Sequence, residues 1–285
     1  RDFCLSRGLG DVYKRQNPGS VTLTPGGVGR NIAHDLCLLG LDVSLVSAVG
    51  DDSNGEFLLD RCRSLGMDVS RVRVVPGARS SSYLYITDER GDMQLAVNDM
   101  AVCNEISPEY LERVLPGIQA GALVLDTNLP VESLEFICRS SCIPLYADPV
   151  SSVKAMKLRS VMKHLRAIKP NALEAAALTG QTDPELAARA LIDEGVQRVF
   201  ISLGTNGMIA AEGSRILRMP SPEANVVNAT GAGDAAMSAI VWADLHGLSL
   251  EDSARAAQLA GAITCASEES NAPELSRLPG LLAAE

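Results

Sequence analysis

Two glycines and an aspartate stand together at residues 231–234, between an apolar run and a long helical pattern. The stretch reads NVVNATGAGDAAMSAIVWADLHG from residue 225 to residue 247. A helix start leaves several backbone N–H groups unpaired and carries a partial positive charge, and glycines keep side chains out of the way. The pattern therefore predicts a site that holds an anion, with Asp234 beside it. The alternative, that Asp234 only satisfies the helix dipole, explains the aspartate but neither glycine.

The same stretch fits the dinucleotide-binding pattern only in form. GAGDAA matches GxGxxA, but that fingerprint needs a second strand with an acidic residue about 20 residues further on. Here the helix is followed by LSLEDSARAAQLAGAITCAS, which has the pattern of another helix. No glycine in the chain precedes a lysine, so a Walker A loop is absent as well. What remains is phosphate held by bare backbone amides, with a carboxylate beside it.

A second glycine-rich stretch, TPGGVGRN at residues 24–31, also comes directly before a helical pattern. Paired glycines there allow a small ligand to lie against the backbone, and Asn31 offers both a donor and an acceptor. An ordinary turn followed by the first residues of a helix would have the same sequence, and this interpretation is favoured when the stretch is considered alone.

Two further segments carry polar residues at the ends of predicted strands. In KPNALEAAALTG (169–180), Asn171 and Glu174 lie three residues apart on the first turn of a predicted helix. They indicate either a capping box or a pair in which Glu174 reaches Mg²⁺ through water while Asn171 approaches a phosphate. In ISLGTNG (201–207), the turn either borders a nucleotide or makes a tight hairpin, since the strand-like MIAAEG follows.

These segments are placed by an alternation of apolar strand runs and helical patterns that begins near residue 28. Strands that are apolar throughout predict a parallel sheet covered by helices on both faces, with ligands beyond the carboxyl ends of the strands. Residues 19–25 and 80–98 mix polar and apolar residues, and we expect them to form a small antiparallel lid. The predicted fold class is α/β: a three-layer, doubly wound, mostly parallel sheet with a small antiparallel β lid, in one domain over residues 17–285.

Composition restricts the partners. The 285 residues are 46% hydrophobic and 21% charged, which is ordinary for a globular chain with a full core. A net charge of −10 argues against nucleic acid and membrane surfaces as partners, because both are polyanionic. No apolar run approaches the roughly 20 residues of a membrane helix. The seven cysteines include no CxxC pair, so reduced thiols in a cytoplasmic protein are the simplest interpretation.

Residues 1–16, RDFCLSRGLGDVYKRQ, do not follow the alternation. They contain neither a strand run nor a helical stripe, and they resemble translated sequencing-adapter sequence at the end of a reading frame. We expect them to be a non-native extension that is loosely placed.

Taken together, the segments resemble the ribokinase-like (PfkB) family of sugar and nucleoside kinases, from about Asn17 to the C-terminal region. GGVGRN (26–31) is similar to the first family motif, NATGAGD (228–234) to the second, and Asn171 to Glu174 to the family's NxxE. NPGSVTLTPGGVGRNIA, VPGARSSSYLYITDERGDMQLAVNDM, ADPVSSVKAMKLR and KPNALEAAALTG resemble the branch that phosphorylates pseudouridine. The resemblance implies a ribokinase-like fold and transfer of phosphate from ATP, with Mg²⁺, to the 5′-hydroxyl of a ribosyl nucleoside.

The resemblance also implies roles for individual residues. Asp234 would be the base that takes the proton from the sugar hydroxyl, and the anion hole would consist of Gly231, Ala232 and Gly233. Substrate contacts are implied for Gly27, Gly29, Asn31, Asn98, Asp99 and Asn128. Contacts with the nucleotide are implied for Asn171, Glu174, Ser202, Gly204, Thr205 and Gly207, of which Glu174 would hold Mg²⁺ through water. A monovalent-cation site is associated with Asn228 and Thr230, and activation by K⁺ stays open.

Physical considerations add three expectations. Asp234 lies near a helix N-terminus and should stay ionised at neutral pH. The lid should close over the substrate and keep water away from ATP. An exposed lid strand such as residues 81–87 is able to pair across a homodimer.

The chain departs from the family at its start. Relatives open with an apolar strand that ends in a substrate-binding aspartate, where this chain has residues 1–16. We therefore expect weakened or absent turnover, and a nucleotide-binding protein without catalysis is an alternative to a kinase. Ribose, another sugar or another nucleoside is the alternative substrate.

Overall fold

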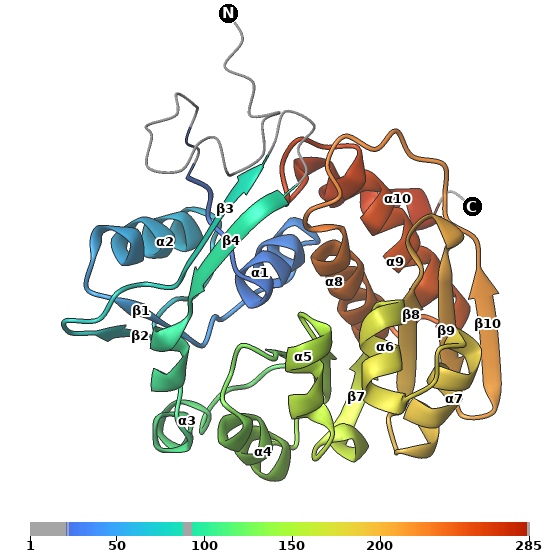
Figure 1. The fold of residues 1–285 in the computed structure, drawn as a ribbon, viewed down its shortest axis with the longest axis horizontal. Helices are drawn as coiled ribbons and strands as arrows, with labels where there is room; N and C mark the ends of the chain where they lie inside the picture. The colour runs from blue at the N-terminus through green and yellow to red at the C-terminus, as the bar shows by residue number, and fades with distance from the viewer. Residues whose placement is uncertain (1–20, 22, 88–92, 284–285) are drawn as a thin grey trace, which may run out of the picture.

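A computed structural model describes residues 21, 23–87 and 93–283 (Figure 1). Its main sheet has six strands in the order β10–β9–β8–β7–β6–β5. Strands β5 to β8 pair in parallel, whereas β9 and β10 pair antiparallel at one edge. The strands are β5 (Leu123–Asp126), β6 (Leu145–Asp148), β7 (Leu165–Ile168), β8 (Arg198–Ser202), β9 (Met208–Glu212) and β10 (Arg215–Met219).

The strands of the main sheet direct alternate side chains into two hydrophobic cores, as their period of two requires. Tyr146, Ala167 and Phe200 lie in one core, and their neighbours Ala147 and Ile168 lie in the other. All five residues are buried. Both faces of the sheet are therefore covered, which is why its strands are apolar throughout in the sequence.

Two groups of helices cover these faces. The core that holds Tyr146 and Phe200 also contains residues of α1 (Val28–Leu38), α8 (Ala232–Leu245) and α9 (Leu250–Cys265). The opposite core contains residues of α3 (Pro108–Val114), α4 (Val131–Ser140), α5 (Ser152–Ala155), α6 (Ala172–Thr179) and α7 (Pro184–Asp193). The other α-helices are α2 (Ser53–Ser64) and α10 (Leu278–Ala283). None of the helices in the described part of the chain has the length and apolar character of a membrane span.

Two small sheets stand outside the main sheet. β1 (Ser47–Gly50) pairs in parallel with β2 (Val72–Val75), and β3 (Ser82–Thr87) pairs antiparallel with β4 (Met93–Asp99). We call the β3–β4 ribbon the flap (Figure 1). A mostly parallel central sheet with helices on both faces and a small antiparallel sheet confirms the predicted fold class.

The first expected lid strand, over residues 19–25, is not present where the structure describes that segment. Val21 and residues 23–25 have no strand, and the side chains of Val21 and Leu23 are 94% and 68% exposed. Pro25 and the glycines that follow it explain the difference, because proline has no N–H to donate to a neighbouring strand and glycine weakens one. Residues 19, 20 and 22 lie outside the described residues, as do residues 1–16.

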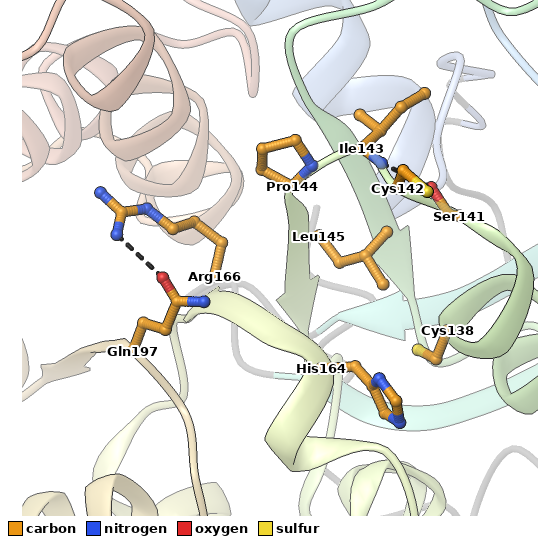
Figure 2. A pocket seen from close by; sticks show the side chains of 9 residues that line it. All are labelled: Cys138, Ser141, Cys142, Ile143, Pro144, Leu145, His164, Arg166 and Gln197. Atoms are coloured by element: carbon orange, nitrogen blue, oxygen red, sulfur yellow. Dashed lines mark hydrogen bonds between the residues drawn. The ribbon is translucent and has the colours of Figure 1, made fainter.

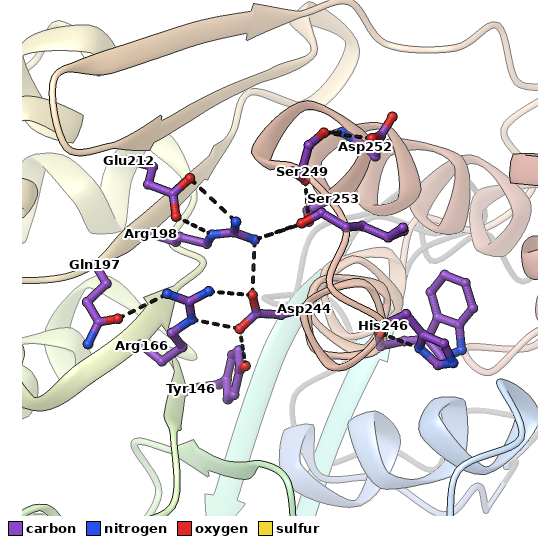
Figure 3. A network of polar contacts seen from close by, with 12 residues as sticks. Tyr146, Arg166, Gln197, Arg198, Glu212, Asp244, His246, Ser249, Asp252 and Ser253 are labelled. Atoms are coloured by element: carbon purple, nitrogen blue, oxygen red, sulfur yellow. Dashed lines mark hydrogen bonds and ion pairs between the residues drawn. The ribbon is translucent and has the colours of Figure 1, made fainter.

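A network of polar side chains joins the C-terminal end of α8 to the main sheet (Figure 3). Asp244 accepts hydrogen bonds from Arg166 at 2.6 and 2.7 Å and from Arg198 at 3.0 Å. The hydroxyl of Tyr146 donates to the same carboxylate, and Arg198 also pairs with Glu212 at 2.7 Å. Because Tyr146, Arg166 and Arg198 belong to β6, β7 and β8, one carboxylate anchors the end of α8 to three strands.

Candidate active site

The carboxyl ends of the parallel strands gather polar residues along one edge of the main sheet. Asp126 ends β5, Asp148 ends β6, and Lys169 directly follows β7. Asn171 lies next along the edge and forms a β-bridge with Ser202, the last residue of β8. In an open parallel sheet, this is the edge at which ligands bind.

The residue that directly precedes helix α8 has to be glycine. Gly231 has a left-handed backbone with a φ of 86°. A Cβ atom at this position would lie 1.9 Å from the carbonyl oxygen of Ser270, which is a backbone atom and has little room to move. The tight contact with Ser270 therefore fixes where the first turn of α8 lies.

Three N–H groups at the start of α8 have no acceptor among the described residues. They belong to Gly231, Gly233 and Asp234. The N–H of Ala232 instead reaches the carbonyl oxygen of Ala229 at 3.4 Å. The unpaired donors are those that a helix N-terminus offers to an anion. They overlap with the implied set of residues 231–233 and extend it to Asp234.

Asp234 is contacted by Asn31 of the glycine-rich stretch at residues 24–31, which lies 203 residues earlier in the chain. The side-chain amide of Asn31 donates from Nδ2 to Oδ2 of Asp234 at 2.7 Å. Arg30 donates to Oδ1 of the same amide. Because arginine only donates, the oxygen of Asn31 has to face Arg30 and its nitrogen has to face Asp234. The structure thus brings together residues from two of the predicted motifs.

Gly27 and Gly29 of that stretch lie at the start of α1. Gly27 precedes the helix with a φ of 98°, which favours glycine. The N–H of Gly29 donates to Oδ2 of Asp126 at 3.0 Å, and a Cβ atom at Gly29 would lie only 3.0 Å from the same oxygen. Glycine therefore lets the start of α1 lie directly against the end of β5.

Lys169 and Asp148 form a buried ion pair near the start of α8. Nζ of Lys169 lies 3.1 Å from Oδ2 of Asp148, and the two side chains are 6% and 7% exposed. A Cβ atom added at Gly233 would lie 3.4 Å from the same Nζ. Burial acts to lower the pKa of Lys169, but the charge and hydrogen bond of Asp148, together with the charges of Glu174 and Asp234, outweigh it and the pKa is raised. The lysine is therefore positively charged, close to the unpaired N–H groups.

The pKa of Asp234 is raised to about 7, chiefly because its carboxyl group is buried. The hydrogen bond from Asn31 lowers this pKa, the charge of Asp148 raises it, and the charge of Lys169 lowers it. The expectation that Asp234 stays fully ionised at neutral pH was wrong, because desolvation outweighs the favourable field of the helix N-terminus. A carboxyl group with this pKa both takes up and releases a proton near neutral pH.

Asn171 and Glu174 form a capping box at the start of α6. Oδ1 of Asn171 accepts from the Glu174 N–H at 2.9 Å, and Oε2 of Glu174 accepts from the Asn171 N–H at 2.8 Å. The other carboxylate oxygen of Glu174 accepts no hydrogen bond from the described residues. The local capping role therefore leaves one oxygen of Glu174 for a cation or for water bound to it.

Residues 201–207 form a tight hairpin between β8 and β9. The 3₁₀ turn Gly204–Asn206 lies at its tip, where Gly204 and Thr205 are exposed. Gly207 has a φ of 92°, and a Cβ atom there would lie 1.9 Å from the Met219 carbonyl oxygen. The hairpin interpretation thus accounts for Gly207, while Ser202 lies beside Asn171 and is followed by Gly204 and Thr205 in the turn.

Three residues with an implied substrate contact take no part in the contact between Asn31 and Asp234: Asn98, Asp99 and Asn128. Asn98 and Asp99 are exposed on β4, and no hydrogen bond among the described residues joins them to Asn31 or Asp234. Asn128 follows β5, and its Oδ1 accepts from Nζ of Lys154 at 2.6 Å.

Asn228 and Thr230 lie in the segment that leads into α8. The N–H of Thr230 donates to Oδ1 of Asn228 at 2.9 Å, and Nδ2 of Asn228 donates to the Glu268 carbonyl at 3.0 Å. These bonds tie the segment to the C-terminal part of the chain, so the amide of Asn228 has a structural role there.

Sequence reasoning assigned no role to Asp126, Asp148 or Lys169. Each follows an apolar run, in ALVLD, IPLYAD and RAIK, so the end of each predicted strand was the available signal. The sequence pattern does not give the order of the strands in the sheet. That order makes β6 and β7 neighbours and so brings Asp148, at the end of β6, close to Lys169, just after β7.

A separate cavity of about 430 Å³ lies at the opposite, amino-terminal edge of the sheet (Figure 2). It is lined by Leu145 at the start of β6, by His164 and Arg166, and by Gln197 just before β8. The guanidinium of Arg166 is engaged by Asp244 and by Oε1 of Gln197. None of the predicted site residues lines this cavity.

Comparison with known proteins identifies the family. The pfkB family of carbohydrate kinases matches residues 9–277 of the chain. The pseudouridine kinase of Escherichia coli strain K12 is 38% identical over 272 residues, which cover 93% of this chain and 87% of that protein. The chain therefore belongs to the pfkB family of carbohydrate kinases, and the predicted membership is confirmed.

Solved structures agree with this membership. A carbohydrate kinase from Agrobacterium tumefaciens is 28% identical, covers 95% of this chain and 90% of its own, and has a TM-score of 0.79. A ribokinase-fold protein of E. coli, solved in complex with ATP and Mg²⁺, is 19% identical, covers 94% and 92%, and has a TM-score of 0.82, which is evidence of the fold alone. The chain is thus a phosphotransferase that acts on a hydroxyl group of a sugar or nucleoside.

Proposed function

We propose that this chain transfers the terminal phosphoryl group of ATP to the 5′-hydroxyl of a ribosyl nucleoside, with pseudouridine as its substrate. The observation that carries the proposal is the 2.7 Å contact between Asn31 and Asp234, beside the unpaired N–H groups at the start of α8. The identity of 38% with the E. coli pseudouridine kinase supports the choice of nucleoside.

Asp234 is the base in this proposal. Its carboxylate takes the proton of the 5′-hydroxyl while the hydroxyl oxygen forms a bond to the γ-phosphorus. The bond from the γ-phosphorus to the β–γ bridging oxygen breaks, and ADP leaves with that electron pair. Because the pKa of Asp234 is about 7, the group is able to return the proton to solvent at neutral pH.

The N–H groups of Gly231 and Gly233, together with Lys169, stabilise the charge on the transferring group. Unpaired amides held in place by the helix need no reorganisation when negative charge develops. Lys169 adds a full positive charge in a buried position, where water screens it little. In other enzymes, removal of one such donor lowers kcat by about 100- to 1,000-fold.

The nucleotide side of the site is assigned to the edge formed by Asn171, Glu174 and Ser202, with Gly204, Thr205 and Gly207 in the adjoining hairpin. The unpaired carboxylate oxygen of Glu174 is a hard donor of the kind that Mg²⁺ and its bound water require. When bound, Mg²⁺ neutralises charge on the phosphates. The E. coli structure with ATP and Mg²⁺ has the same fold, which supports these two ligands.

The remaining assignments concern the nucleoside and a monovalent cation. Gly27, Gly29 and Asn31 hold the ribose, with Asn128 as a further polar contact. Asn98 and Asp99 reach the uracil edge when the flap closes. A K⁺ site is assigned to Asn228 and Thr230 on the family resemblance, and a comparison of turnover in K⁺ and in Na⁺ tests it.

A substrate panel tests the proposed function. ADP release is measured with ATP, Mg²⁺ and either pseudouridine, uridine, inosine or ribose, and each substrate is ranked by kcat/KM. Because the substrates are compared by the ratios of their kcat/KM values, the ranking does not depend on how fast the chain turns over any one of them. We expect pseudouridine to be preferred by at least about tenfold, whereas preference for ribose would overturn the nucleoside assignment.

The variant Asp234→Asn tests the mechanism. We expect loss of turnover with ATP binding nearly unchanged in calorimetry, because the amide keeps the size of the carboxyl group but accepts no proton. Asp252→Asn is a matched control, since Asp252 is also a half-buried aspartate in the first turn of a helix, but it lies on α9. Turnover by the Asp234 variant close to that of the control would show that another group is the base.

We also propose that the flap pairs with a second copy of the chain. Leu84 lies opposite Val97 and Ile86 lies opposite Leu95, so four aliphatic side chains share one face of the ribbon. They are 62%, 59%, 44% and 49% exposed. An apolar face of this kind is suited to a twofold contact with its own equivalent.

The oligomeric state tests this pairing. Light scattering after size exclusion should give a dimer for the parent chain and a monomer for Leu84→Glu. Tyr85→Ser changes the opposite face of the same strand and is the matched control, for which we expect a dimer. A parent chain that stays monomeric at high micromolar concentration would exclude the pairing.

A further inference from the structure

One side chain outside the proposed catalytic set holds the backbone of Asn31. Nδ2 of Asn271, just before the 3₁₀ turn Pro273–Arg277, donates to the Asn31 carbonyl at 3.1 Å. The same nitrogen donates to Oδ1 of Asp35 at 2.8 Å. Asp35 lies one helical turn after Asn31 on α1, so Asn271 bridges two consecutive turns of that helix.

Arg30 completes a closed arrangement around Asn31. Its Nη2 donates to Oδ1 of Asn271 at 3.1 Å, to Oδ1 of Asn31, and to the Pro25 carbonyl at 2.6 Å. Asn31 is thus held at its backbone by Asn271 and at its side-chain oxygen by Arg30. Its only remaining side-chain donor is Nδ2, which contacts Asp234. The orientation of that donor therefore depends on groups that do not touch Asp234.

Asp35 is the second buried carboxyl group of this arrangement. Its side chain has no exposed surface, and its Oδ2 has no hydrogen-bond partner among the described residues. Burial raises its pKa to about 7, the hydrogen bond from Asn271 lowers it, and the charge of Asp234 raises it. The pKa of the fully buried Asp35 and that of the partly buried Asp234 are thus both raised to about 7, and the charge of Asp234 contributes to the shift of Asp35.

The charged groups around Asp35 come from three elements besides the C-terminal segment. On α1 and α8 they are Arg30, His34 and Asp234. α2 contributes Arg61 and Cys62, which act on Arg30, and the C-terminal segment contributes Glu269, which acts on His34. Of these, Arg30 and Asp234 act on Asp35 directly, with opposite sign.

We propose that Asp35 is a positioning residue for Asp234. Through Asn271 and Arg30 it fixes the amide of Asn31 that donates to Asp234, and its ionised carboxylate makes removal of the proton from Asp234 harder. The proposal rests on the proposed function, in which Asp234 has to be ionised to act as the base. It adds that the fall of kcat/KM on the acidic side of its pH profile reflects protonation of the coupled pair Asp35 and Asp234, not of Asp234 alone.

The pH dependence of kcat/KM in Asp35→Asn tests the proposal. The amide keeps the acceptor for Asn271 and removes the charge, so we expect the apparent pKa of the acidic limb to fall by about half a pH unit or more. Asp42→Asn removes an equal charge from an exposed position just after α1, and its profile should coincide with that of the parent chain. An Asp35→Asn profile that coincides with the parent profile would overturn the proposal.

A double-mutant cycle on stability provides a measurement that needs no turnover. Unfolding is followed in the parent, Asp35→Asn, Asp234→Asn and the double variant at pH 5 and at pH 8.5. Because the pKa of each carboxyl group is raised to about 7, we expect both to be mostly protonated at pH 5 and mostly ionised at pH 8.5, so a coupling that comes from charge should appear only at the higher pH.

The two experiments separate two kinds of failure. If no substrate is turned over, the proposed function fails, but the cycle still measures the interaction between Asp35 and Asp234. A coupling that is the same at both pH values, or zero at both, would show that the charge of Asp35 does not reach Asp234. In that case the positioning proposal fails even if the chain is an active kinase.

Discussion

Replacing Gly233 by alanine separates the stability of α8 from the chemistry proposed at its start. Gly233 is the second residue of α8 and is exposed, with an ordinary negative φ. Only Nζ of Lys169 lies within 4 Å of the added Cβ atom, at 3.4 Å, which is ordinary contact. Alanine is favoured over glycine in a helix by up to about 1 kcal/mol, so we expect unchanged or slightly higher stability.

The same methyl group points into the space between the backbone of α8 and Lys169. A phosphoryl group bound by both would have to occupy that space, so the methyl group would displace it from the amides. Loss of one preorganised donor in other enzymes costs about 3 to 4 kcal/mol, which corresponds to a fall in kcat of about 100- to 1,000-fold. We therefore expect Gly233→Ala to be folded and nearly inactive.

Thermal unfolding and ADP release on the same preparation check this expectation. Gly280→Ala is the matched control, because Gly280 is also helical and has open space around its Cβ position. Gly231→Ala is the opposite case: its backbone is left-handed and its Cβ atom would lie 1.9 Å from the Ser270 carbonyl, so it should lose stability as well as activity. If Gly233→Ala keeps most of its kcat, phosphate is not held between α8 and Lys169 and the reasoning is refuted.

Three further results are expected. Lys169→Met should lower kcat by at least about 100-fold, because the charge that stabilises the transferring group is lost. It should also destabilise the fold by about 3 kcal/mol, because Asp148 is left buried without its ion-pair partner. An isothermal unfolding curve that matches that of the parent chain would contradict the second expectation. Because Asp234 has to be ionised, kcat/KM should fall about tenfold per pH unit below pH 7, and a flat profile down to pH 5.5 would exclude it as the base. Asp244→Asn should destabilise the fold by about 3 kcal/mol and leave the ranking of substrates unchanged, as denaturant titration and the substrate panel would show.

Local pattern was sufficient for the parts of the site that depend on neighbours in the chain. The glycine at the start of α8 and the capping box of Asn171 and Glu174 are examples, because a helix start has the same needs in any fold. The contact between Asn31 and Asp234 depends instead on α1 and α8 lying side by side, which no spacing in the sequence expresses.

The charge state of Asp234 was beyond sequence reasoning for a related reason. The helix N-terminus is a local feature and suggested an ionised group, whereas burial depends on how much water the whole fold excludes. The partners Asp148 and Lys169 follow from the order of β6 and β7, and Asn271 is placed by a C-terminal segment without a motif. The first expected lid strand is absent at Val21 and residues 23–25, because the adjacent proline and glycines oppose a strand despite the mixture of polar and apolar residues.

Helix α8 is fastened at both of its ends. At its start the backbone of Gly231 lies tightly against Ser270, and near its end Asp244 is bound by residues of three strands. Because α8 is held at both ends, we expect Asp234 to keep its position relative to the main sheet. The flap, whose two strands pair only with each other among the described strands, is the part that we expect to move when substrate enters and product leaves, so we expect its opening rate to limit turnover.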